Sequence, residues 1–275
     1  MKYLAPAKIN LFLDVLNRRE DGYHNLSMIM QTIDLCDEIE IEKAEKILMD
    51  SNKTDIPLNE KNLAWKAAEL FFEYTKINGG CKIYLKKIIP DGAGLGGGSS
   101  DAAQVLIALN EIYDAKLSNE ELKNIAVKIG ADVPFFIEKG CCLAEGIGDI
   151  LTPIENRTNP YVLVYKPEFS ISTKWVYENL NLNNRTRKNT SELIELLKDG
   201  NMKFYDGIFN VLEDVSETKY PVIEDIKNKF KNLGATNAMM TGSGSAVFSI
   251  FVDEIKAKEA LGHFEKERIF FTKFL

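Results

Sequence analysis

The amino-acid sequence predicts an α+β protein made of two domains with a cleft between them. Its 275 residues exceed the roughly 100–200 residues of a usual single domain. Strand-like and helix-like segments occur together in both halves of the chain, which is typical of α+β folds. The polar run 155–160 (ENRTNP) is the best candidate for a linker. We therefore expect an N-terminal domain over residues 1–156 and a C-terminal domain over residues 157–275.

Alternating apolar residues predict the first strand. From Ala7 to Val15 every second side chain is apolar, which is the period of a half-buried strand. Lys8 and Asn10 then share the opposite face of this strand. The segments expected next are a turn at 21–22 and strands over 28–35 and 38–43.

Apolar side chains at helical spacing predict a helix that begins after Asn62, with Leu63 and Ala67 on its apolar face. The run 78–80 (NGG) ends this helix, because glycine and asparagine interrupt regular structure. Residues 81–87 are expected to form a strand that leads into a glycine-rich run.

The glycine-rich run is the most distinctive segment of the chain. Residues 92–98 contain five glycines in seven positions, which is incompatible with regular structure. Helical spacing resumes from Ala102 to Tyr113, and Ser99, Ser100 and Asp101 are expected to cap the N-terminus of that helix. The loop therefore leads into a helix N-terminus.

The remaining elements follow from the same signals. Ser118 followed by Glu121 is a capping box, so a helix is expected over 118–129, ending at Gly130. The other expected segments are strands around 141–144, 149–154 and 161–165, a mainly helical region over 172–233, strands over 236–240 and 246–251, and a final helix and strand.

A strand, a glycine loop and a helix N-terminus in succession suit phosphate binding. Free N–H groups and the positive end of the helix dipole converge there, and the absence of Cβ atoms lets the backbone approach phosphate oxygens. A flexible linker is the less favoured interpretation, because a strand and a capped helix flank the run.

Other phosphate-binding motifs do not fit this loop. Residues 92–97 formally match G-x-G-x-x-G, but a dinucleotide-binding unit needs a following strand with an acidic residue, and a second helix follows here. Gly98-Ser99 lacks the lysine of a Walker motif. The H-R-D and D-F-G triplets of protein kinases are absent from the sequence.

Composition excludes several classes of protein. Hydrophobic residues make up 45% and charged residues 27%, as in globular proteins. A net charge of −7 and the lack of a Lys/Arg stripe argue against a nucleic-acid partner. No apolar run approaches the roughly 20 residues of a membrane span, and the N-terminus does not resemble a secretory signal. We expect no membrane partner and a cytoplasmic location.

The cysteines agree with a reducing compartment. They lack the spacing of a disulfide framework or a zinc site. The adjacent pair Cys141-Cys142 could be redox-active, but we interpret it as two small apolar side chains in a strand. The four cysteines are Cys36, Cys81, Cys141 and Cys142.

Lys8 and Asp132 are the candidate catalytic residues, and each has a second interpretation. Lys8 is equally compatible with an edge-strand or snorkelling lysine. Asp132, in the run 130–136 (GADVPFF), is equally compatible with an N-cap just before a proline. Together they suit phosphoryl transfer to an alcohol, because a carboxylate can accept the hydroxyl proton and a nearby ammonium favours the developing alkoxide. The glycine loop and Mg²⁺ would supply positioning and charge neutralisation.

Several motifs resemble one kinase family. The run 90–103 (PDGAGLGGGSSDAA) resembles the ATP-phosphate loop of GHMP kinases, and its extended glycine form resembles the diphosphocytidyl-methylerythritol kinases in particular. Three further segments are similar to signatures of that family: 5–11 (APAKINL) with 19–26 (REDGYHNL), then 130–136, and 241–245 (TGSGS). The resemblance spans the whole chain.

The resemblance implies a GHMP kinase two-domain fold, with a ribosomal protein S5 domain 2-like N-terminal domain, a ferredoxin-like α/β C-terminal domain and an active site in the cleft. It implies ATP-dependent phosphorylation of the 2-hydroxyl of 4-diphosphocytidyl-2-C-methyl-D-erythritol, in the non-mevalonate route to isopentenyl diphosphate. ATP and Mg²⁺ are the implied cofactors. Asp132 is implied as the general base and Lys8 as its electrostatic partner.

The resemblance also implies binding residues. The implied ATP-binding residues are Pro90, Asp91, Gly92, Ala93, Gly94, Leu95, Gly96, Gly97, Gly98, Ser99 and Ser100, with Asn62 and Leu63 as part of the adenine pocket. The implied substrate-binding residues are Asn10, Tyr23, His24, Tyr177, Gly242 and Ser243. Tyr177 is expected to stack on the cytosine, since a planar base needs a π-face. Without the resemblance, a surface-loop histidine and a core aromatic would be the favoured interpretations.

Two positions depart from the family pattern. Asp91 stands where relatives usually carry an apolar or small residue, and a carboxylate beside a triphosphate would be repulsive, so we expect it to point outward. The run 244–246 (GSA) replaces a more frequent ending, which leaves the contacts of that loop open.

Two alternative functions remain open. The first is another GHMP small-molecule kinase, of the homoserine or mevalonate type, against which the run 21–24 (DGYH) and Tyr177 argue. The second is a non-catalytic nucleotide-binding protein on the same fold, against which the presence of both Lys8 and Asp132 argues. The sequence identifies neither the Mg²⁺ ligands nor the oligomeric state, a monomer or a weak homodimer.

Overall fold

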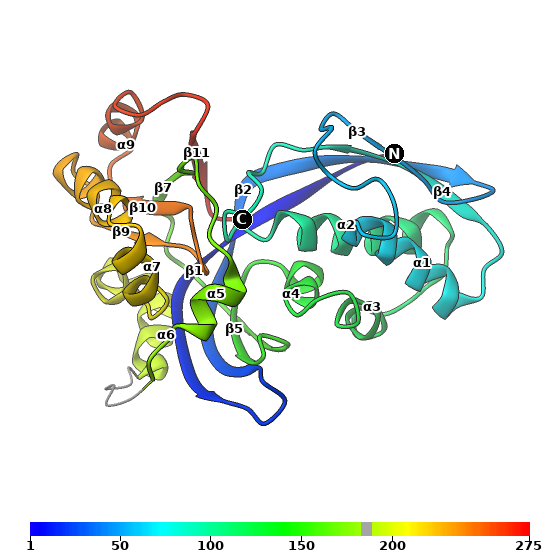
Figure 1. The fold of residues 1–275 in the computed structure, drawn as a ribbon, viewed down its shortest axis with the longest axis horizontal. Helices are drawn as coiled ribbons and strands as arrows, with labels where there is room; N and C mark the ends of the chain where they lie inside the picture. The colour runs from blue at the N-terminus through cyan, green and yellow to red at the C-terminus, as the bar shows by residue number, and fades with distance from the viewer. Residues whose placement is uncertain (183–188) are drawn as a thin grey trace. The chain divides into compact units, whose positions relative to one another are not determined.

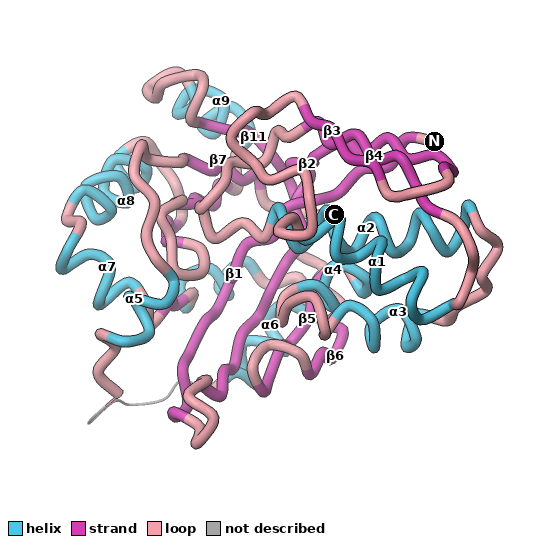
Figure 2. Tube along the Cα trace, turned by 45° about the vertical axis from the view of Figure 1, so that its right-hand side comes forward, coloured by secondary structure: helices cyan, strands magenta, loops and turns pink. Residues whose placement is uncertain are grey.

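The computed structural model describes residues 1–182 and 189–275, which form two compact units. Unit 1 comprises Met1–Ala7, Leu35–Asp91 and Gly96–Lys139, and unit 2 comprises Lys8–Asp34, Gly92–Leu95 and Gly140–Leu275. The long strands β1 (Lys2–Arg18) and β2 (His24–Ala44) contribute residues to both units (Figure 2). Each compact unit combines several separate segments of the chain, so the division into units differs from the single boundary expected after residue 156. That domain boundary stays a prediction.

Unit 1 consists of strands covered by helices. Strand β4 (Gly80–Lys86) pairs with β2 in antiparallel fashion and with β3 (Leu48–Ser51) in parallel fashion. The helices lie on one side of these strands (Figure 1). They are α1 (Leu63–Thr75), α2 (Gly97–Ile112), α3 (Asn119–Ala126) and α4 (Val133–Glu138).

Small side chains let α1 and α2 approach each other closely. The two helices pack together, and their buried faces are rich in alanine. On the sheet, Ile83 and Leu85 alternate with exposed or half-buried residues of β4, as expected for a strand with one face in the core. The buried alanines are Ala64, Ala67 and Ala68 of α1 and Ala102, Ala103 and Ala108 of α2.

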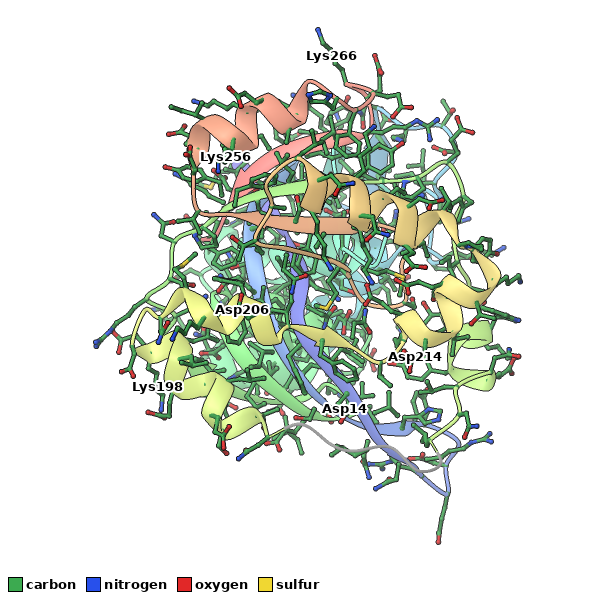
Figure 3. The ribbon with its side chains drawn as sticks, turned by 90° about the vertical axis from the view of Figure 1, so that its left-hand side faces the viewer. Asp14, Lys198, Asp206, Asp214, Lys256 and Lys266 are labelled. Carbon is green, nitrogen blue, oxygen red and sulfur yellow. The ribbon has the colours of Figure 1, made fainter. Side chains whose placement is uncertain are left out.

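Unit 2 contains an antiparallel sheet with the strand order β11-β7-β10-β9. These strands are β7 (Tyr161–Tyr165), β9 (Asn237–Met240), β10 (Val247–Phe251) and β11 (Ile269–Lys273). Helices α8 (Val222–Asn232) and α9 (Glu254–Leu261) cover one face (Figure 3). Every residue of the central strand β10 is buried, which explains its nearly continuous apolar sequence.

The remaining strands of unit 2 extend the sheet formed by residues 8–34 of β1 and β2. Strand β5 (Cys141–Gly146) pairs with β2, and β6 (Ile150–Ile154) pairs with β5. The two-residue strand β8 (Phe209–Asn210) runs parallel to β1. The larger sheet therefore has the order β3-β4-β2-β1-β8, extended from β2 by β5 and β6. The helical segments are α5 (Thr173–Glu178), α6 (Thr190–Lys198), the 3₁₀ helix η1 (Met202–Gly207) and α7 (Glu213–Lys219).

Most elements expected from the sequence are present, and several expectations are wrong in detail. The strands expected over 28–35 and 38–43 are one strand, β2, because the intervening Asp37 is buried and hydrogen-bonded rather than part of a turn. The helix predicted after Asn62 ends at Thr75, earlier than the run 78–80, because Lys76 adopts a left-handed conformation.

Helix capping confirms one prediction and corrects another. The capping box of Ser118 and Glu121 is present at α3. Helix α2, however, begins at Gly97 with Gly96 as its N-cap, so Ser99, Ser100 and Asp101 lie inside its first turns and do not cap it. Among the residues that the structure describes, no helix has the length and apolar character of a membrane span.

Candidate active site

The glycine-rich loop is built from alternating left-handed residues. Gly92, Gly94 and Gly96 have φ angles of 59°, 76° and 72°, a region that side-chain-bearing residues rarely adopt. A Cβ on Gly94 would also lie 2.2 Å from the carbonyl oxygen of Thr241. The backbone at Gly94 is therefore restricted to glycine both by its conformation and by a neighbouring chain segment of unit 2.

The loop leads into an uncapped helix N-terminus. Gly96 has no side chain that could accept a hydrogen bond from the helix N-terminus. The first helical hydrogen bond runs from Ser100 N to Gly96 O over 2.9 Å, so the N–H groups of residues 97–99 come before it in the chain. The Oγ of Ser100 is buried and has no hydrogen-bond partner among the described residues. Backbone N–H groups and an unsatisfied hydroxyl at a helix N-terminus suit the oxygens of a phosphate group.

A buried ion cluster of unit 1 joins the two ends of this loop. Lys87, which precedes the loop, donates to Asp37 of β2 and, over 2.6 Å, to Oδ2 of Asp101 in α2. The three side chains are 3%, 0% and 3% exposed. Asp37 Oδ1 also accepts the N–H groups of Ile88 and Ile89. The incoming strand and the outgoing helix are thus tied to one ammonium group.

Burial shifts the ionisation of this cluster. Burial raises the pKa of Asp101 to about 7, although the Lys87 ammonium opposes the rise. Burial lowers the pKa of Lys87, but the two carboxylates outweigh it, and the net pKa of Lys87 is raised. The Oδ1 atom of Asp101 has no hydrogen-bond partner among the described residues, which agrees with a carboxyl group that burial disfavours as an anion.

Lys8 and Asn10 lie in unit 2 on the central strand β1. Lys8 is only 4% exposed, so it does not reach toward solvent as a snorkelling lysine would. Strand β8 pairs with β1 only at Phe12 and Leu13, and at Lys8 the backbone on that side of β1 is bonded by a loop residue instead of a strand. Its Nζ donates to Oδ1 of Asn10 over 2.6 Å, and its backbone N–H donates to Leu95 O over 3.0 Å. Asn10 thus orients the buried ammonium of Lys8, and the backbone of Lys8 is bonded to Leu95 in the middle of the glycine-rich loop.

The second glycine motif, loop 241–245, lies against the same residues of unit 2. Asn10 N donates to Oγ1 of Thr241 over 3.1 Å, and Ala246 N donates to Ala93 O over 3.2 Å. The hydroxyls of Ser243 and Thr173 lie 2.7 Å apart. The structure therefore brings together four segments that the sequence motifs single out separately: Lys8 with Asn10, residues 92–95, the start of α5, and loop 241–245.

The aromatic pair predicted for the base is also assembled. The rings of His24 and Tyr177 stack with centroids 5.0 Å apart and an interplanar angle of 26°. Burial lowers the pKa of His24, and the positive charge of Arg18 lowers it further, which favours the neutral imidazole. Tyr23 next to it is 62% exposed. The binding of cytosine by these rings stays a prediction.

The remaining predicted residues lie in unit 1. Asp132 occupies the N-cap position of α4 with a proline just inside the helix, as the capping interpretation expects, although its side chain makes no capping hydrogen bond. Its role as the general base stays a prediction. Asn62 does cap α1, accepting from Ala64 N over 2.9 Å. Leu63 lies beside Gly98, where an added Cβ would be 3.7 Å from Leu63 Cδ1. The pairing of Asp132 with Lys8, which belongs to unit 2, stays a prediction.

Asp91 and Pro90 complete the predicted loop. Asp91 is exposed and Pro90 is half-buried. An exposed carboxylate agrees with the expectation that Asp91 points outward, and its relation to a bound triphosphate stays a prediction.

Several residues of the site are not predicted by the sequence. Lys87 and Asp37 do not stand out, because single charges at the ends of strands are common on protein surfaces. Asn210 donates from Nδ2 to Gly242 O over 2.8 Å, and its only sequence signal is a polar amide within the apolar run 208–212 (IFNVL).

The chain is similar to known proteins over most of its length. Residues 62–140 match the family model described as the GHMP kinases N terminal domain, and residues 174–267 match that of the GHMP kinases C terminal domain. A 4-diphosphocytidyl-2-C-methyl-D-erythritol kinase of Clostridium botulinum (strain Kyoto / Type A2) is 49% identical over 257 residues, 92% of each chain. The enzyme of the same name from Clostridium perfringens is 43% identical over 281 residues, 99% of this chain and 98% of the relative.

Solved structures show the same similarity. A crystal structure of 4-(cytidine 5'-diphospho)-2C-methyl-D-erythritol kinase superposes with a TM-score of 0.86 at 34% identity and covers 100% of this chain and 99% of the other. Homoserine kinase from Cytophaga hutchinsonii superposes with a TM-score of 0.79 at 18% identity, covering 99% and 94% of the two chains, which shows a shared fold.

Replacing Gly94 tests the restriction of the loop backbone. We expect Gly94→Ala to lower the free energy of unfolding by about 2–4 kcal/mol, because it combines a left-handed alanine with a clash against a backbone oxygen. Gly98→Ala is the matched control: its Cβ would meet only ordinary contact inside a helix, so stability should hold or rise by up to about 1 kcal/mol. Urea unfolding measures both. Equal stabilities of the two variants would contradict the restriction at Gly94.

The pKa of Asp101 predicts a pH-dependent stability. The folded protein keeps the Asp101 proton up to about pH 7, whereas the unfolded chain releases it near pH 4. This group therefore stabilises the fold at low pH, and that contribution is lost as pH rises through 7. Asp101→Asn cannot ionise, so its stability relative to wild type should increase from pH 5 to pH 7, by at most about 1.4 kcal/mol per pH unit. Parallel urea-unfolding profiles of the two proteins between pH 5 and pH 8 would refute this.

Proposed function

Because the chain belongs to the GHMP kinases and, within them, to the 4-diphosphocytidyl-2-C-methyl-D-erythritol kinase family, we propose that it phosphorylates the 2-hydroxyl of 4-diphosphocytidyl-2-C-methyl-D-erythritol with ATP. The products are the 2-phosphate and ADP, and the reaction belongs to the non-mevalonate route to isopentenyl diphosphate. One structural observation supports the proposal most: three left-handed glycines open onto the uncapped N-terminus of α2.

This loop would bind the polyphosphate of ATP. The N–H groups of residues 97–99 precede the first helical bond of α2, and the Ser100 hydroxyl is buried and unsatisfied within the described residues. These donors and the helix dipole would hold the phosphate oxygens in one geometry, which is the main contribution a protein makes to phosphoryl transfer. Leu63, beside Gly98, would contact the adenine.

Mg²⁺ would enter with the nucleotide. Among residues 1–182 and 189–275 there is no group of three or more histidine, cysteine, aspartate or glutamate side chains arranged to hold a metal ion. The buried and unsatisfied Oγ of Ser100 would fit as one protein ligand of Mg²⁺, which in kinases is held largely by phosphate oxygens and water. When bound, Mg²⁺ supplies charge neutralisation on the transferred group.

Asp132 and Lys8 would carry the proton chemistry. The 2-hydroxyl oxygen attacks the γ-phosphorus, the bond from that phosphorus to the β-phosphate oxygen breaks, and ADP leaves. The hydroxyl proton moves to the carboxylate of Asp132. The buried ammonium of Lys8, oriented by Asn10, would favour the ionised carboxylate and the developing alkoxide.

The cytidine end of the substrate would be bound in unit 2. The stacked pair of His24 and Tyr177 offers flat aromatic surface to the cytosine, and Tyr23 lies exposed beside it. Gly242 and Ser243, in the loop that contacts Asn10, would contact the remainder of the substrate.

The proposal places the reaction in the cytoplasm, where ATP is available and thiols stay reduced. None of the four cysteines, all of which lie in the described residues, forms a disulfide. Burial raises the pKa of Cys141, which opposes a redox role for the pair Cys141-Cys142 in β5.

An ADP-release assay tests the substrate assignment. The purified protein should release ADP from Mg-ATP in the presence of 4-diphosphocytidyl-2-C-methyl-D-erythritol, and neither homoserine nor mevalonate should replace that substrate. Turnover of homoserine or mevalonate in preference to the diphosphocytidyl compound would refute the assignment, and so would ATP binding without any turnover.

Replacing Asp132 tests the proposed base. We expect Asp132→Asn to lower kcat by about 10²–10⁴-fold, because the hydroxyl proton loses its acceptor, while the dissociation constant for ATP changes little. Glu138→Gln at the other end of α4 is the control and should leave kcat unchanged, since Glu138 forms an ion pair with Lys123 of α3 and has no role in the proposed chemistry. An Asp132→Asn enzyme with wild-type kcat would remove Asp132 from the mechanism.

A further inference from the structure

The backbone of Met240 at the end of β9 is held by side chains rather than by a strand. β9 is the outer strand of the antiparallel sheet of unit 2, so its far edge has no strand partner in that sheet. There, Met240 N donates to Oε1 of Glu213 over 2.7 Å, and Met240 O accepts from Nδ2 of Asn210 over 2.8 Å. Two side chains therefore satisfy the two polar groups that an edge strand would otherwise expose.

The same asparagine reaches into loop 241–245. Its Nδ2 also donates to Gly242 O over 2.8 Å, and its Oδ1 accepts from Leu212 N over 3.0 Å. Asn210 is 2% exposed, and all of these bonds are therefore made away from bulk water. In such surroundings the alternative to each bond is an unsatisfied polar group, so the loop backbone is held firmly.

The support behind Asn210 and Glu213 is itself fixed. Asn210 lies in β8, which pairs with Phe12 and Leu13 of β1, two and three residues after Asn10. Glu213 Oε2 forms an ion pair with Lys227 of α8 over 3.0 Å, and both side chains are largely buried. Figure 3 labels Asp206 and Asp214, which lie on either side of β8 along the chain. Strand β8 is therefore bonded both to β1, which carries Asn10, and to loop 241–245, and it positions the two relative to each other.

We propose that Asn210 and Glu213 are positioning residues for the substrate-binding loop 241–245, and this inference rests on the proposed function. Neither side chain has to touch the substrate. They hold the main chain on both sides of Thr241, whose Oγ1 accepts from Asn10 N and whose carbonyl oxygen packs against Gly94. Loss of this support would let Gly242 and Ser243 move away from the substrate, and small displacements in an active site reduce turnover strongly.

The test compares two asparagines of similar geometry. Asn210→Asp keeps the side-chain shape and the acceptor for Leu212 N, but replaces the amide group that donates to Met240 O and Gly242 O with an oxygen. Asn237→Asp is the matched control, because Asn237 at the other end of β9 likewise donates to a carbonyl, Tyr205 O, over 2.8 Å, and accepts from the N–H of Ala238. A second pair compares Glu213→Gln, which keeps an acceptor for Met240 N, with Glu213→Ala, which removes it.

The readouts are steady-state kinetics and amide hydrogen exchange of the peptide that covers residues 238–248. We expect Asn210→Asp and Glu213→Ala to raise KM for the diphosphocytidyl substrate by about tenfold or more. KM for Mg-ATP should rise less than KM for the diphosphocytidyl substrate, since the ion cluster of Lys87 and the bond from Lys8 N to Leu95 O still hold the phosphate loop. Exchange in 238–248 should accelerate in both variants. Glu213→Gln should restore most of the wild-type behaviour, and Asn237→Asp should leave KM, kcat and exchange in this peptide unchanged.

The outcomes separate the two proposals. A wild-type protein that does not turn over the diphosphocytidyl substrate would overturn the proposed function, while faster exchange in Asn210→Asp alone would still support positioning of the loop. Wild-type turnover combined with unchanged KM and unchanged exchange in Asn210→Asp would overturn the positioning role. Equal losses for both substrates, or equal effects of Asn237→Asp, would also overturn it. If Asn210→Asp does not fold, the comparison of Glu213→Ala with Glu213→Gln tests the same positioning role.

Discussion

The buried ammonium of Lys87 sets the geometry on which the glycine-rich loop depends. Removing a charge from water costs several kcal/mol, and that cost is offset only when the partners are close and well oriented. Lys87 meets this condition with Asp37 and Asp101, both of which are almost fully buried. A buried ion cluster contributes little net stability compared with apolar packing, but it defines one arrangement of the segments that carry it. Here those segments are the strand before the loop and the helix after it.

Because the ion cluster holds both ends of the loop, side-chain contacts are not needed to hold its glycines in place. Gly92, Gly94 and Gly96 adopt left-handed conformations, and Gly94 lies too close to Thr241 O for any Cβ. Glycine loses more conformational freedom on folding than any other residue, so an unsupported run of glycines would be mobile. Two kinds of contact hold the loop in place. The ion cluster of unit 1 holds its ends, and backbone hydrogen bonds from Lys8 N and Ala246 N in unit 2 hold residues 93 and 95.

Much of the fold could be predicted because its elements have local signals. The alternation from Ala7 to Val15 and the capping box at Ser118 each correspond to a strand and a helix in the structure. Predictions failed where a distant group decides the outcome. Local patterns put Asp37 between two strands, but hydrogen bonds to residues about fifty positions away keep it inside β2. The same patterns make Asp101 a cap of α2, but Lys87 takes its carboxylate into the core.

By itself, the sequence determined most of the strands and helices, the position of a glycine-rich loop before a helix, and the resemblance to GHMP kinases, because periodicity, capping and short motifs act over a few residues. Only the tertiary structure decided that Lys87 joins both ends of the loop, that His24 stacks on Tyr177, and that Asn210 and Glu213 hold loop 241–245. These contacts join residues that are far apart along the chain, and the bond from Asn210 to Gly242 alone spans 32 positions. Their energies depend on burial and orientation, which no local spacing of residue types encodes.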